Sequence, residues 1–160
     1  MDRGMRMDER GSPEHGAALV EFAVLAPLLI LLLFGLIEFS WLFSQNLDVR
    51  HGAREGARIA AVDGFADTDG NGTVSPGEVA AQVCSRMDAG AVAGDTLIST
   101  TRTGGTVGSD VAVTVDAPPQ SLTGFFATFI PSSMRLRSTV TNRLEQPNPV
   151  WPIFAGEPCP

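Results

Sequence analysis

The sequence contains no lysine and no tyrosine, and all 11 of its positively charged side chains are arginines. Acidic residues outnumber them, 18 to 11, which leaves a formal net charge of −7 over 160 residues. Nucleic-acid binding depends on basic surfaces that displace counterions from phosphates, and this sequence has no basic stripe. We therefore expect no nucleic-acid partner.

Catalytic side chains in a recognisable pattern are also missing. The two histidines, His15 and His51, are isolated, the serines have no paired base, and no glycine-rich phosphate loop follows a predicted strand. The sequence therefore predicts a protein that is not an enzyme, and it disfavours an anchored hydrolase.

Only two cysteines are present, Cys84 and Cys159, and neither belongs to a CxxC pair of the kind found in redox or zinc sites. If this part of the chain is extracytoplasmic, a disulfide that ties the tail to the domain is one interpretation. The other is one buried thiol and one tail thiol. The sequence leaves both interpretations open.

Charge is absent from Phe22 to Ile37, and after Glu38 the chain continues with the apolar residues Phe39, Trp41, Leu42 and Phe43. As a helix, Phe22 to Phe43 spans about 33 Å, enough to cross a bilayer about 30 Å thick. The run is longer than the core of a secretory signal and lacks a small-x-small cleavage site. We therefore expect residues 17–44 to form a transmembrane helix that stays in the membrane.

A short polar leader, residues 1–16, precedes this helix and ends in a glycine. Five residues after Gly16, the Glu21 carboxylate lies at the edge of the hydrocarbon, where a charge is costly without a partner. This layout is typical of a type IV prepilin-like substrate. A membrane aspartyl peptidase would cut after Gly16, and the new ammonium group of Ala17 would pair with Glu21 of a neighbouring subunit. Alternatively, Glu21 is an interfacial residue beside an uncut anchor.

The helical pattern continues beyond the membrane as a stem, residues 45–62, which contains no proline and carries small residues at positions 52, 53, 56, 57 and 60. These small residues form a surface for close packing. We predict one helix from about Ala17 to Val62, kinked at Pro27. Glu38 either contacts a partner helix or is solvated at the outer interface, near Trp41.

Residues 67–78 match the calcium-loop pattern D-x-[DN]-x-[DN]-G-x5-E at every fixed position. The pattern assigns oxygen ligands to six residues: Asp67, Asp69, Asn71, Thr73, Ser75 and Glu78. Thr73 would give its carbonyl and Glu78 both carboxylate oxygens. Asparagine at the third ligand position indicates modest affinity, suited to extracellular calcium. The alternative is an acidic turn that only resembles a binding loop.

The remaining sequence predicts a small domain, residues 63–146, followed by a tail, residues 147–160. We expect, in order, a helix at 78–91, a hairpin of strands 96–102 and 110–116, and a third strand at 134–144. Residues 122–130, which include three phenylalanines, are expected to cap the core. The tail contains five prolines and is expected to be extended rather than packed.

These elements predict an α+β, pilin-like fold, in which the extracytoplasmic stem of a long N-terminal transmembrane helix packs on a small antiparallel sheet. Residues 16–62 resemble the TadE-like family of pilus-assembly proteins. The resemblance rests on these features: Glu21-Phe22, Pro27, the leucine run, Gly35, Glu38-Phe39 and the alanine-arginine stem at 53–58. Residues 138–145 are similar to the closing strand of that family.

The resemblance implies a pseudopilin-like component of a tight-adherence (Flp-type) pilus and secretion system. Its implied partners are a prepilin peptidase, other pilus or pseudopilin subunits, and the assembly machinery. The implied location is the cytoplasmic (inner) membrane, crossed once, with the C-terminal domain outside the cytoplasm. The resemblance does not predict the calcium loop. The competing interpretation is an unprocessed, membrane-anchored module for calcium-dependent binding or adhesion.

Overall fold

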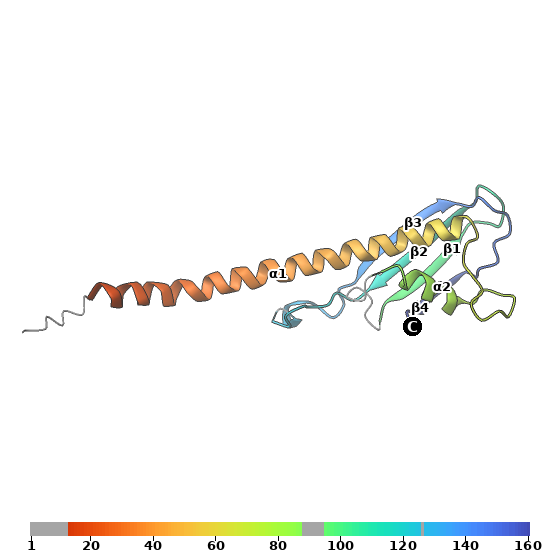
Figure 1. Cartoon of the computed structure of the whole chain (residues 1–160). Coiled ribbons are helices and arrows are strands. Elements are labelled where there is room, and N and C mark those ends of the chain that lie inside the picture. The colour runs from red at the N-terminus through yellow and green to blue at the C-terminus, as the bar shows by residue number, and fades with distance from the viewer. Residues whose placement is uncertain (1–12, 88–94, 126) are drawn as a thin grey trace, which may run out of the picture. The chain divides into compact units, whose positions relative to one another are not determined.

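The computed structural model describes residues 13–87, 95–125 and 127–160, with side-chain surroundings from Gly16 onward. The chain divides into two units, Met1–Ile37 and Glu38–Pro160, and helix α1 (Pro13–Ala61) contributes to both (Figure 1). The helix begins before the predicted start at Ala17, because proline is well tolerated in the first turn. It continues as one helix through Pro27. Residues 1–12 of the predicted leader lie outside the described residues.

The first unit contributes the apolar part of α1. Every large apolar side chain between Leu19 and Ile37 is exposed. Within the described residues, α1 is the one helix that is long and apolar enough to cross a membrane. An apolar surface of this extent is stable in hydrocarbon and not in water.

The second unit contains a four-stranded antiparallel sheet in the order β3-β2-β1-β4. The strands are β1 (Leu97–Arg102), β2 (Asp110–Ala117), β3 (Leu136–Arg143) and β4 (Phe154–Pro158). β1 and β2 form the predicted hairpin, and β3 is the predicted third strand. Val111, Val113 and Val115 of β2 are buried on one face, as their alternation with polar residues predicts. The α+β prediction is confirmed.

The core lies between this valine face and two helices, the C-terminal part of α1 and α2 (Pro76–Cys84) (Figure 1). Gly56 of α1 lies close to both the sheet and α2. A Cβ placed there would lie 3.0 Å from Val113 of the sheet and 3.0 Å from Val83 of α2. The small residues of the stem therefore bring three elements into direct contact, as predicted.

The expectation that the proline-rich tail stays unpacked is wrong. Trp151 is 1% exposed, its ring meets Phe65 edge-on at 6.0 Å, and the Arg102 guanidinium lies 5.1 Å from its centroid. The residues that follow form β4, an edge strand, where proline costs few hydrogen bonds. The domain therefore includes the tail and extends to Pro160.

Two other local expectations are also corrected. The segment 122–130 does not cap the core, because Leu122, Phe125 and Phe129 are all exposed; Phe126 lies outside the described residues. Helix α2 ends at Cys84, capped by Ser85, and not at position 91. Residues 88–91 of that prediction lie outside the described residues.

Candidate functional site

The predicted cleavage site lies at the start of α1. Gly16, Ala17 and Glu21 are all exposed on the helix, and Ala17 and Glu21 are one turn apart. A Cβ placed on Gly16 would have no atom within 4 Å. In the part of the chain that the structure describes, no hydrogen bond or ion pair reaches the Glu21 carboxylate.

The calcium-type loop brings three carboxylates together. Asp67, Asp69 and Glu78 each offer an oxygen within 4.8 Å of the others. The Asp67 carboxylate accepts hydrogen bonds from the backbone N–H of Gly70 at 2.8 Å and of Gly72 at 2.6 Å. Gly72 has a φ of 90°, which only glycine adopts without strain, so the sharp turn depends on it.

Glu78 connects this loop to α2. One of its carboxylate oxygens accepts from the backbone N–H of Asp69 at 3.1 Å and also from Thr68. The other accepts from the Ser75 N–H at 2.8 Å and the Ser75 hydroxyl at 2.9 Å, while Ser75 caps the helix in return. Hydrogen bonds from the Ser75 and Thr68 backbone lower the pKa of Glu78 from 4.5 to about 2. The carboxylate is therefore ionised at neutral pH.

The other predicted ligands lie in the same loop. The Asn71 amide donates to an Asp69 oxygen at 2.7 Å, and its own oxygen accepts from the Thr73 N–H at 2.9 Å and the Thr73 hydroxyl at 2.6 Å. The side-chain donor set consists of oxygens, including three carboxylates, which is the set that calcium prefers over zinc or copper. The residues present thus fit the metal that the motif suggests.

The structure joins Cys84 and Cys159 in a disulfide, with Cα atoms 6.0 Å apart and a sequence separation of 75. Cys84 is the last residue of α2, and Cys159 directly follows β4. The bond therefore fastens the helix that starts at the calcium-type loop to the edge strand at the C-terminus.

Sequence reasoning missed a polar cluster on α1. Glu38 is 3% exposed, and its carboxylate accepts from the N–H groups of Leu122 and Thr123 at 3.1 and 3.2 Å and from the Thr123 hydroxyl at 2.9 Å. Glu38 thus contacts a loop of its own chain, and neither of the two predicted environments is correct. We call segment 120–130 the aromatic loop.

Gln45 completes the cluster two turns further along α1. Its amide donates to the Gln120 carbonyl at 2.7 Å and accepts from the Gln120 N–H at 2.9 Å. Glu38 and Gln45 are seven residues apart and so share one face of the helix. Two polar residues seven positions apart in a mostly apolar part of the helix are the sequence signal for a helix face on which another segment packs.

Comparison with known families bears on the helix and its stem. The model of the TadE-like protein family matches residues 16–58. The match begins at the predicted cleavage glycine and ends at Arg58 in the stem, so the resemblance is confirmed over this segment. It supports a role in pilus assembly. No curated protein and no solved structure matches the chain.

Proposed function

We propose that this chain is a membrane-anchored, pseudopilin-like subunit of a tight-adherence (Flp-type) pilus system. A prepilin peptidase removes residues 1–16, and the mature subunit, in the cytoplasmic membrane, associates with other subunits and the assembly machinery. One observation carries this proposal: the TadE-like family model matches from Gly16 to Arg58, within the helical stem.

The surroundings of Gly16 support a cut at this position. The fold itself does not require glycine there, because a Cβ would meet open space. Glycine inside a helix costs about 1 kcal/mol relative to alanine. A glycine that the fold does not need is explained by a peptidase that tolerates no side chain before the cut.

The surroundings of Glu21 support assembly through the new N-terminus. A carboxylate beside an exposed apolar helix is costly in a membrane unless it finds a partner. Cleavage would create an ammonium group on Ala17, and the Glu21 of a neighbouring subunit would offset its own penalty by pairing with that group.

The processing step is tested with a Gly16→Val variant, with Gly11→Val as the control for a glycine elsewhere in the leader. We expect wild type and Gly11→Val to have Ala17 as the mature N-terminus, and Gly16→Val to retain residues 1–16. The measurement is intact mass and N-terminal sequencing of protein extracted from membranes that contain the peptidase. Retention of the leader by wild type would reject the proposal and favour the unprocessed adhesion module.

We also propose that the loop at 67–78 binds calcium and that binding stiffens the extracytoplasmic domain. Asp67, Asp69 and Glu78 would supply carboxylate oxygens, and bound calcium would supply charge that offsets their mutual repulsion. Because Glu78 also caps α2, occupancy of the loop would fix the start of that helix.

Thermal unfolding of the detergent-extracted chain tests this proposal. Calcium at a hundredfold excess over its dissociation constant would stabilise the fold by about 2.7 kcal/mol, and equal magnesium by much less. Asn71→Asp adds a charged ligand and should reach the same shift at lower calcium concentration. Glu78→Gln should remove the shift, while Glu145→Gln, an exposed change outside the loop, should keep it. An unchanged Tm at millimolar calcium in wild type would eliminate the metal site.

A further inference from the structure

The aromatic loop carries apolar side chains to the surface in a segment without charge. No charged residue occurs between Asp116 and Arg135. Leu122, Phe125 and Phe129 are 53%, 58% and 76% exposed. Exposed apolar groups collected in one charge-free segment are typical of a surface that meets an apolar environment.

The loop is fixed to α1 at a specific level. Its backbone donates two hydrogen bonds to Glu38, which directly follows the charge-free stretch of α1, Phe22 to Ile37. Gln45 holds Gln120 in the same way two turns later. Leu122 and Thr123 are therefore placed where the charge-free stretch of the helix ends.

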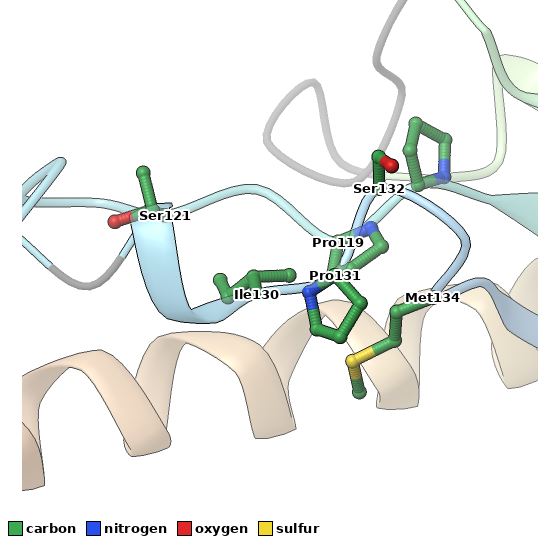
Figure 2. A pocket seen from close by; sticks show the side chains of 8 residues that line it. Pro119, Ser121, Ile130, Pro131, Ser132 and Met134 are labelled. Carbon is green, nitrogen blue, oxygen red and sulfur yellow. The ribbon is translucent and has the colours of Figure 1, made fainter.

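The loop also has internal structure. Prolines, Ile130 and Met134 gather around a cavity of about 150 Å³, shown in Figure 2. The Ser121 hydroxyl accepts from the Gly124 N–H at 2.9 Å, and a short 3-10 turn, η1 (Ala127–Phe129), follows. The exposed side chains thus project from a folded segment and not from a loose connection.

We propose that the aromatic loop is a second membrane anchor, whose Leu122, Phe125 and Phe129 enter the boundary between headgroups and acyl chains of the bilayer that α1 crosses. Aromatic rings favour that boundary, and the absence of charge removes the main cost of entering it. The lipid surface fits better than a protein partner because the loop is attached at the end of the charge-free stretch of α1 and has no charge to select a protein partner.

This arrangement also revises the extent of the transmembrane segment. Residues 17–37 as a helix span about 31 Å, which matches the hydrocarbon thickness of a bilayer. Glu38 then lies at the membrane surface, where the loop satisfies its carboxylate with three hydrogen bonds. Residues 38–44, predicted as membrane-spanning, belong to the second compact unit, Glu38–Pro160, and the proposal places them at the membrane surface.

The test uses the full chain in vesicles of phosphatidylethanolamine and phosphatidylglycerol, with a nitroxide on single cysteines introduced as Phe129→Cys or Phe125→Cys. The native cysteines are joined to each other and do not take the label. Val107→Cys, an exposed apolar site in the β1–β2 turn at the opposite end of the strands, is the aqueous control. Ile30→Cys, an exposed site in the middle of the apolar run, reports the hydrocarbon. The readout is relaxation by oxygen, enriched in lipid, against relaxation by a water-soluble nickel chelate.

Labels at 125 and 129 should be relaxed more by oxygen than by nickel, in the same sense as the label at 30 and opposite to the label at 107. Nickel accessibility at 125 and 129 equal to that at 107 would overturn the proposal. Shielding that appears only as the protein-to-lipid ratio rises would also overturn it, in favour of contact between copies. If the label at 30 still reports hydrocarbon in either case, the anchor of the proposed pilus subunit stands while the loop proposal fails.

Discussion

Loss of the Cys84–Cys159 bond should weaken the fold substantially. The bond closes a separation of 75 residues, and the chain-entropy relation for such a loop gives about 4.5 kcal/mol as an upper value. Domains of this size have a total stability of about 5–15 kcal/mol. Opening the bond should therefore remove a large share of the free energy of unfolding and release β4 first, because β4 is an edge strand.

Urea unfolding of the detergent-extracted chain measures this effect, with every form carrying Trp41→Phe so that the fluorescence of Trp151 alone reports the release of the tail from Phe65. The comparison is between oxidised wild type, reduced wild type and the Cys84→Ala/Cys159→Ala double variant. Alanine keeps the sites apolar, and reductant should leave the double variant unchanged, which controls for side effects of the reagent. We expect both bond-free forms to unfold at clearly lower urea concentration. Equal midpoints for all three forms would refute the account of the tail as a stapled part of the core.

Two further predictions concern packing and charge in the same domain. Gly56→Val should cost about 2 kcal/mol in urea unfolding, because its side chain would overlap Val113 across the sheet contact; an unchanged midpoint would mean that the helix does not pack as described. Asp116→Asn should cost about 2 kcal/mol, because it leaves Arg135 and Arg137 without their nearly buried partner. Burial acts to raise the pKa of Asp116, but the two guanidinium groups outweigh it and lower that pKa below 3.8. Its stabilisation is therefore complete above pH 3.8 and is lost as the pH falls through the lowered pKa; a variant as acid-sensitive as wild type would contradict this assignment.

Patterns that repeat along the chain predicted most of the regular structure. The apolar run and the small residues of the stem predicted α1 and its packing, and the alternation in β2 predicted which face is buried. These predictions succeed because the spacing of apolar or small residues along each element determines which of its faces is buried. Boundaries were less accurate, as at the C-terminus of α2, where the helix stops at Cys84.

The sequence predicts an unpacked tail because proline content reflects only the local conformational preference of a segment. Trp151 gains its stability from Phe65 and Arg102, which lie far away in sequence. A single large aromatic ring among prolines outweighed the local preference for extension, since burial of such a side chain contributes about 3 kcal/mol. Cys159 was the other sequence signal that the tail is attached to the domain, because it is joined to Cys84 in a disulfide.

For the aromatic loop, the sequence wrongly predicts packing against the core, whereas its described phenylalanines are exposed. That prediction rests on the tendency of apolar side chains to be removed from water. The hydrophobic effect is not directional, so it does not determine whether they pack in the core or against another apolar surface. The polar groups determine how the loop is oriented. Glu38 and Gln45 can be buried on α1 only with hydrogen-bond partners, and the loop backbone supplies these partners. Once that backbone faces the helix, the rings on the other side must point outward. Because α1 is long and apolar enough to cross a membrane, the exposure of a ring near the end of its charge-free stretch is consistent with burial in lipid.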